Sequence, residues 1–201
     1  MIMNATYEKQ MITHPWIFWD DGFTDEQLQK VIDYSLTQPT KKGEVFKAGG
    51  EQETNAVRKS DIRFIDKAPD IAWFFEHMNN LIGILNERWY DYHLTGYDYF
   101  QYTEYHAEEQ GHYDWHMDMT TGSTTNWQSA TRKLSLSLVL NDDYEGGEFQ
   151  FNTGGEDRAL VAEQKKGRIL AFPSFIQHRV LPVTKGVRKS IVIWVVGPKW
   201  T

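Results

Sequence analysis

Apolar residues recur with helical spacing in two segments of the first half of the chain. In the earlier one, four apolar side chains share one helical face: Leu28, Val31, Ile32 and Leu36. Thr24 and Gln27 have the spacing of a capping box, and Pro39 ends the pattern. The spacing predicts a helix that covers a sheet.

The later segment, from Pro69 to Trp89, has the clearest periodicity in the chain. Apolar side chains recur there at steps of three and four, at Ile71, Phe74, Phe75, Met78, Leu81, Ile82, Leu85 and Trp89. Pro69 is tolerated in a first helical turn. The pattern predicts a second helix packed on the core, with His77 as an ordinary helix histidine.

Short segments of strand character account for most of the rest. An aromatic strand is expected at residues 14–19, and further strands at 97–105, 134–140, 148–152, 158–162, 167–172, 178–181 and 190–196. Two helices followed by about eight strands indicate an α+β fold, with the helices packed on a β-sandwich or barrel. We expect one domain over residues 1–201, with 1–95 as helical support plus a loop and 97–200 as the β core.

Residues 40–60 are polar, contain three glycines and show little periodicity. Loops of this length are often functional, so the segment is a candidate substrate lid. A disordered surface loop without a function fits the length and composition of this segment equally well.

Composition narrows the classes of function. The net charge of −7 disfavours binding to nucleic acid, which needs clustered Lys and Arg. The chain has no cysteine, so a metal would need His and carboxylate ligands. Neither a leader nor a membrane span is expected from the hydropathy, which predicts a cytoplasmic protein without a membrane partner.

Candidate ligands are densest in the segment from Gly111 to Asp118. In an extended strand the even-numbered side chains would share one face: His112, Asp114, His116 and Asp118. Such a row is costly to bury, and a metal would explain it. The two-residue spacing is the same in both His-x-Asp pairs, so spacing does not decide between them.

Two later residues add to this picture. His178 begins a strand after an apolar one, and Arg188 precedes the apolar strand 190–196. An arginine there can reach into a barrel and hold a carboxylate by two parallel hydrogen bonds. Taken singly, His178 also fits a core histidine, and Arg188 fits a solvated charge at a strand end.

Together with Tyr105, these motifs carry a family resemblance. The C-terminal half resembles the iron- and 2-oxoglutarate-dependent dioxygenases of the prolyl 4-hydroxylase type, small bacterial and phage members included. The matching segments are Tyr105 with Gly111–Asp118, then Arg132–Ser135 with Leu140–Asn141, Tyr144–Phe149, Phe172–Ser174, His178–Val183, and Gly186–Ser190 before Trp194.

The resemblance implies a double-stranded β-helix in which His116, Asp118 and His178 bind Fe(II). This ligand set leaves positions for 2-oxoglutarate and dioxygen. The implied reaction decarboxylates 2-oxoglutarate to succinate and hydroxylates a C–H bond of the substrate. An aspartate at position 118 favours hydroxylation over halogenation, and ascorbate is an implied accessory.

The resemblance also assigns roles around the metal. Arg188 would clamp the far carboxylate of 2-oxoglutarate. Tyr105 either donates its hydroxyl to the same carboxylate or is a packed strand tyrosine. His112 and Asp114 are left as rim or supporting residues.

The sequence is therefore compatible with three functions. The first is hydroxylation of a prolyl residue in a peptide or protein, and the second is hydroxylation of a free amino acid or another small molecule. The third, from a different class, is a non-catalytic β-sandwich module with a metal site. Such a module has no use for a carboxylate clamp at Arg188.

Overall fold

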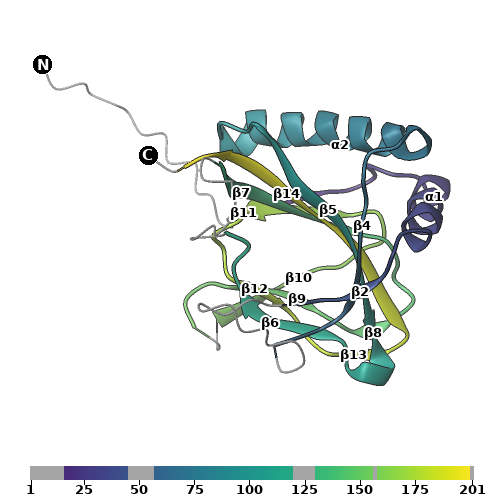
Figure 1. Ribbon diagram of the computed structural model, residues 1–201. Coiled ribbons are helices and arrows are strands. Elements are labelled where there is room, and N and C mark those ends of the chain that lie inside the picture. The colour runs from purple at the N-terminus through teal and green to yellow at the C-terminus, as the bar shows by residue number, and fades with distance from the viewer. Residues whose placement is uncertain (1–15, 45–56, 120–129, 156–157, 200–201) are drawn as a thin grey trace, which may run out of the picture.

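Two antiparallel sheets face each other in the computed structural model, which describes residues 16–44, 57–119, 130–155 and 158–199 (Figure 1). The larger sheet has seven strands in the order β1-β11-β7-β14-β5-β4-β2. Their bounds are β1 Ile17–Trp19, β11 Ile169–Pro173, β7 Ala130–Val139, β14 Val187–Pro198, β5 Gly96–His106, β4 Asp61–Phe64 and β2 Lys41–Lys42.

The smaller sheet has five strands in the order β10-β9-β12-β6-β3. They are β10 Ala159–Ala162, β9 Phe149–Asn152, β12 His178–Val180, β6 His112–His116 and β3 Arg58–Lys59. A separate two-stranded ribbon pairs β13 Val183–Lys185 with β8 Glu145–Gly146. The expected strands are present, and residues before 97 add strands to both sheets, which the pattern did not predict.

Both predicted helices lie on the outer face of the larger sheet (Figure 1). Helix α1 spans Asp25–Leu36 and has the capping box, in which Thr24 Oγ1 accepts from the Gln27 amide. Helix α2, Ala72–Leu85, follows a 3₁₀ turn at Pro69–Ile71 and leads into a π-helical turn at Asn86–Tyr90. A further 3₁₀ turn, Ala107–Glu109, follows β5. No helix in the described part of the chain is long and apolar enough to cross a membrane.

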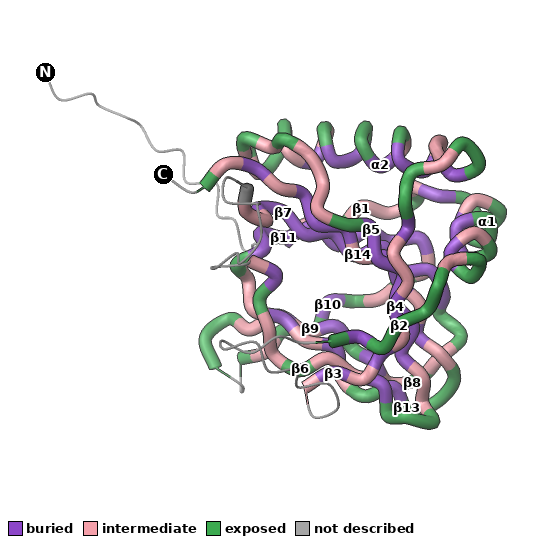
Figure 2. Tube along the Cα trace, viewed as in Figure 1, coloured by how far each residue is buried: buried purple, intermediate pink, exposed green. Residues whose placement is uncertain are grey.

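The alternation of Leu and Ser along β7 makes one face of the larger sheet apolar and the other polar. Leu134, Leu136 and Leu138 are fully buried in the cluster that also contains the apolar faces of both helices. Ser135 and Ser137 alternate with them and therefore point between the sheets. Figure 2 shows the resulting burial on the central strands and on the sheet-facing side of α2.

A second apolar cluster fills part of the space between the sheets. It is mainly aromatic and contains Trp16, Tyr105, Phe149, Phe151 and Phe172. This cluster lies beside the polar inner face, so the interior is apolar on one side and polar on the other. The candidate lid falls partly outside the described residues, because only its ends are seen, in β2 and β3.

Leu136→Ala tests the helix–sheet core. Leu136 is fully buried between β7 and the helices, so the deletion should lower the free energy of unfolding by about 3 kcal/mol. Val161→Ala is the control, because Val161 is 58% exposed on the edge strand β10 and should cost less than about 0.5 kcal/mol. Urea denaturation of both variants measures the difference, and equal losses would contradict this assignment of the core.

Candidate active site

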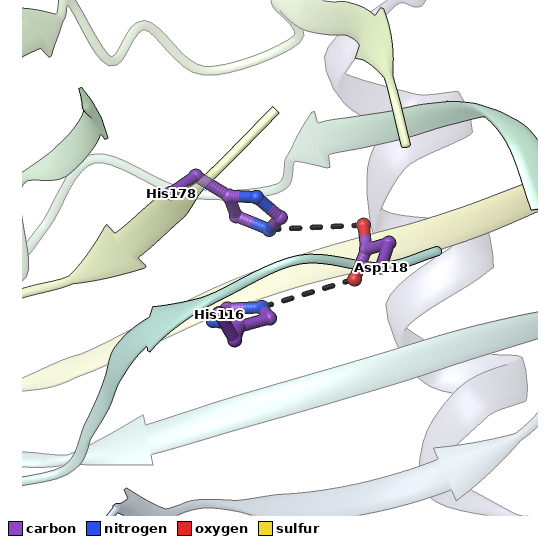
Figure 3. A group of neighbouring side chains, drawn as sticks. All are labelled: His116, Asp118 and His178. Carbon is purple, nitrogen blue, oxygen red and sulfur yellow. Dashed lines mark ion pairs between the residues drawn. The ribbon is translucent and has the colours of Figure 1, made fainter. Parts of the chain in front are cut away.

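Strand pairing brings three of the predicted ligands together. His116 is the last residue of β6, His178 is the first residue of β12, and the two are direct partners in the antiparallel ladder. Asp118 lies just past the end of β6. One potential ligand atom from each of these residues lies within 4.8 Å of the others. Figure 3 shows both imidazoles turned toward the carboxylate.

Backbone carbonyls fix both imidazoles in the orientation that a metal requires. His116 Nδ1 lies 2.8 Å from the Asp114 carbonyl, and His178 Nδ1 lies 3.0 Å from the Ile176 carbonyl. A neutral imidazole in this position donates from Nδ1, which leaves the lone pair of Nε2 free. The Nε2 atoms lie 3.8 and 3.7 Å from the two Asp118 oxygens, His116 facing Oδ1 and His178 facing Oδ2.

The donor set fits a divalent cation. Asp118 is only 6% exposed, and its Oδ2 is buried without a hydrogen-bond partner among the described residues. A buried acceptor without a donor is costly unless a cation meets it. Two imidazoles and one carboxylate on one side of a site are the ligand set of non-haem Fe(II) oxygenases.

The surroundings keep the imidazole of His116 neutral. Burial lowers the pKa of His116 to about 3, and the adjacent imidazole of His178 acts in the same direction. Burial also opposes ionisation of Asp118, but the interactions with the His178 and His116 side chains and a hydrogen bond from Ser135 outweigh it and hold the pKa of Asp118 below its usual range. A neutral imidazole and an ionised carboxylate are the forms that bind metals.

The prediction that four even-numbered residues share one face is wrong. The register shifts between the pairs His178–His116 and Val180–Tyr113, so β6 contains an irregularity at this point. As a result Tyr113 lines the cavity and stacks on the His116 ring, with centroids 3.4 Å apart. Asp114 is exposed and accepts from the Trp115 amide. The His112 ring turns to the Gln110 carbonyl instead of the cluster.

Arg188 is buried in the same cavity as the cluster. Its side chain is the largest of the fully buried ones, at 1% exposure. Its Nη1 donates to Ser190 Oγ at 3.2 Å and its Nη2 to Gln164 Oε1 at 3.0 Å, while Nε has no partner. No carboxylate of the described residues pairs with it. A buried guanidinium without a counter-charge calls for an anionic ligand.

Tyr105 also lines this cavity. It is 4% exposed and its ring centroid lies 5.5 Å from the Arg188 guanidinium carbon. β5 and β14 pair these two residues directly. The position is compatible with both expected roles, a hydroxyl donor to an anion or a packed tyrosine.

Sequence reasoning missed Arg58, a second buried arginine of the cavity. It comes from β3 at the edge of the smaller sheet, is 6% exposed, and donates from Nε to Ser60 Oγ at 2.8 Å. Its guanidinium carbon lies 4.6 Å from the centroid of Tyr113. Arg58 stands at the end of a polar, aperiodic segment, where the hydrophobic pattern carries no signal of burial.

The fold and the cluster thus define a two-sheet β protein with a His–Asp–His site in its interior. Residues 100–196 match the family model described as the 2OG-Fe(II) oxygenase superfamily. This segment is therefore similar to that superfamily, in agreement with the resemblance that the motifs carry.

Two comparisons with relatives agree. A "PKHD-type hydroxylase" of Synechococcus sp. (strain CC9311) is 38% identical over 91 residues, which are 44% of this chain and 38% of the relative. One from Teredinibacter turnerae is 34% identical over 87 residues, 42% of this chain and 38% of the relative. The aligned residues therefore span less than two fifths of these relatives.

Solved structures share the whole fold. A prolyl-4-hydroxylase from Pseudomonas putida superposes with a TM-score of 0.66 at 17% identity, covering 94% of this chain and 95% of that one. A prolyl hydroxylase from Trichoplax adhaerens, in complex with a hypoxia-inducible-factor peptide fragment, gives 0.70 at 20% identity over 91% and 84%. These likenesses confirm the double-stranded β-helix fold.

The pH dependence of stability tests the buried state of His116. An unfolded imidazole titrates near pH 6.5, whereas His116 in the folded chain takes a proton only near pH 3. Because the unfolded state binds more protons between these values, stability of the metal-free chain should fall as pH drops from about 6.5, by up to about 1.4 kcal/mol per pH unit.

His116→Gln should flatten this slope, because glutamine does not titrate. Urea denaturation with a chelator present, at several values between pH 7 and 4.5, measures both proteins. Asp118 does not interfere, since its contribution is lost only below about pH 3.9, where an unfolded aspartate titrates. Equal slopes in the two proteins would show that His116 is not the cause.

Proposed function

We propose that this chain is an Fe(II)- and 2-oxoglutarate-dependent dioxygenase that hydroxylates a C–H bond, with a prolyl residue of a peptide or protein as the substrate. One observation carries the proposal: the His116–Asp118–His178 cluster and the unpaired buried Arg188 line the same cavity. The first calls for a cation and the second for an anion. Fe(II) with a dicarboxylate satisfies both.

In this proposal His116, Asp118 and His178 hold the metal, and Arg188 binds the carboxylate of 2-oxoglutarate that lies away from it. When bound, Fe(II) and 2-oxoglutarate supply the oxidation, in which dioxygen gives one oxygen atom to succinate and one to the substrate C–H bond. The chain supplies placement of the groups and exclusion of water.

Placement of the cosubstrate depends on how Arg188 is held. Ser190 and Gln164 each accept from one end of the guanidinium, which fixes its plane. A planar fork fixed in this way can offer two parallel hydrogen bonds to a carboxylate. The proposal gives Tyr105, whose ring centroid lies 5.5 Å from the guanidinium carbon, the role of an additional hydroxyl donor.

Water is excluded from the ligands by aromatic rings. Phe149 stacks on the His178 ring at 5.2 Å, Phe172 meets it edge-on at 4.7 Å, and Tyr113 covers His116. A reacting centre enclosed by apolar rings is protected from side reactions with solvent.

The substrate proposal rests on Arg58 and on the relatives. Arg58 faces the cavity from the strand that precedes β4, and the described residues give it no carboxylate partner. Its guanidinium can donate to the carbonyl of a peptide bond beside the oxidised residue. The resemblance to prolyl hydroxylases, one of them with a bound peptide, supports a prolyl peptide. A free amino acid would place its carboxylate at the same guanidinium and is the alternative.

A non-catalytic metal-binding module is disfavoured by Arg188. A structural metal site needs no buried guanidinium, whose desolvation is costly when no anion meets it. The cation and the anion site in one cavity are explained together by an oxygenase and only in part by a metal-binding module.

Separate losses of metal and cosubstrate test the proposal. Arg188→Ala should weaken 2-oxoglutarate binding by about 10- to 100-fold, the value of charge-assisted hydrogen bonds, and leave Fe(II) affinity nearly unchanged. Asp118→Ala should abolish Fe(II) binding, whereas its control Asp114→Ala should retain it. Anaerobic titration, followed by the visible charge-transfer band of Fe(II) with 2-oxoglutarate, measures both ligands. A folded wild-type protein without the band would overturn the proposal.

The substrate is tested by stimulated turnover. Proline-containing peptides should increase succinate formation above the basal rate and gain one oxygen atom by mass spectrometry, whereas free amino acids should do neither. Arg58→Lys should raise the KM for the peptide about tenfold and leave basal succinate formation measurable, because lysine loses the planar fork. Stimulation by a free amino acid alone would replace the peptide by the small-molecule alternative.

A further inference from the structure

Two β-bulges lie next to each other at one end of the larger sheet. On β14, Val195 and Val196 are adjacent, yet their partners on β7 are Leu134 and Arg132, so β7 has one extra residue. On the other side of β14, Ile193 and Val195 pair with Phe100 and Tyr97, so β5 also has an extra residue. Bulges re-aim side chains and are common beside active sites.

The bulges bring Asp98 of β5 and Arg132 of β7 together. Arg132 Nε donates to Asp98 Oδ2 at 2.7 Å, and its Nη2 lies 2.6 Å from the same oxygen. The two side chains are only 21% and 17% exposed, so water screens the pair little. The guanidinium carbon lies over the Trp194 ring, 4.0 Å from its centroid. Salt bridge and ring together fix the plane of Arg132.

The remaining end of the guanidinium reaches the metal cluster. Arg132 Nη1 contacts the backbone carbonyl of Asp118 at 3.5 Å. Asp118 lies beyond the last residue of β6, so the strand ladder does not hold its backbone. The next amide, that of Met119, donates to the Ser174 carbonyl at 2.9 Å. Arg132 and Ser174 thus hold the two polar groups of one peptide unit, the one between Asp118 and Met119 that directly follows the Asp118 side chain.

We infer that Arg132, held by Asp98, is a positioning residue that sets the Asp118 carboxylate for the metal. The inference rests on the proposed function, since it assumes that Asp118 is a metal ligand. Changing a partner that orients a ligand typically lowers metal affinity by about 10- to 100-fold. The positive charge of Arg132 also favours the ionised form of Asp118 that a metal needs.

The competing role for Arg132 is direct contact with the substrate. Two of its three nitrogens face Asp98, and the third is turned to the Asp118 carbonyl. All three ends are therefore directed at protein groups. A residue that acts on the metal ligand should change metal affinity without any substrate present, and a substrate contact should not.

The chain contains a matched control pair. Arg168 binds Asp20 through Nε at 2.6 Å and Nη2 at 2.8 Å, and its guanidinium lies 4.7 Å from the Phe18 ring centroid. This pair also combines an arginine, an aspartate and an aromatic ring, although Arg168 binds both carboxylate oxygens and contacts Glu163 as well. It lies at the β1 edge of the larger sheet, outside the cavity lining. Substitutions in this pair measure how far the loss of a buried arginine–aspartate pair away from the cavity lowers metal affinity through general destabilisation.

Metal affinity of the full chain, measured by anaerobic Fe(II) titration without 2-oxoglutarate or substrate, tests the inference. Arg132→Lys and Asp98→Asn should each weaken Fe(II) binding by about tenfold, the lower end of the effect of orienting partners. The double variant should lose little more, because each change breaks the same support. Arg168→Lys and Asp20→Asn should keep wild-type affinity.

Co(II) provides a second readout that global stability does not move. The visible absorption of bound Co(II) depends on ligand geometry, so it should shift in Arg132→Lys and stay unchanged in Arg168→Lys. Unchanged metal affinity and spectrum in Arg132→Lys, with only a raised KM for substrate, would overturn the inference in favour of substrate contact. Equal metal losses in the two lysine variants would overturn it in favour of general destabilisation.

Fe(II) binding by wild type and by His116→Ala tests the proposed function separately from the inference about Arg132. Wild-type protein should bind Fe(II) and His116→Ala should not. If wild type and His116→Ala bind Fe(II) equally weakly, the proposed metal site fails and the inference fails with it. If that difference is present and Arg132→Lys equals wild type, only the inference fails.

Discussion

One cavity of the structure buries a carboxylate, that of Asp118, and a guanidinium, that of Arg188, which do not form an ion pair with each other. Asp118 and the two imidazoles present acceptors to one point of the cavity. Arg188 lines the same cavity, and no carboxylate of the described residues pairs with its guanidinium. Each arrangement costs free energy in the empty protein, because buried polar groups without partners lose their hydration. A metal and a dicarboxylate bound side by side would remove both costs. The free energy of unfolding that the chain loses without these ligands would then be recovered when they bind.

Only one face of the larger sheet packs against the helices, which leaves the other face available for this cavity in a chain of 201 residues. Leucines of β7 face the helices and form a conventional core, whereas the serines between them face the other sheet, and Ser137 lines the cavity. The helices therefore stabilise the sheet from outside without filling the interior. Their own stability comes mainly from this apolar packing, as for most helices in globular proteins.

Irregularities in the strands place the functional side chains. The register shift in β6 turns Tyr113 onto His116, and the bulges in β5 and β7 bring Asp98 and Arg132 to the end of the sheet nearest Asp118. A regular ladder would alternate side chains strictly and would turn Tyr113 to the face opposite His116. The site is thus built where the sheet departs from regular pairing.

The sequence alone predicted the two helices and most strands, because hydrophobic periodicity is a local property. The family resemblance singled out His116, Asp118, His178 and Arg188, and these four residues line one cavity. The sequence did not determine which odd or even residues of 112–118 face the cavity, since a bulge reverses the alternation and depends on the partner strand. Nor did it show the burial of Arg58 or the Asp98–Arg132 pair, whose members are far apart along the chain. Only the tertiary structure decided these points, because they follow from pairing between distant strands.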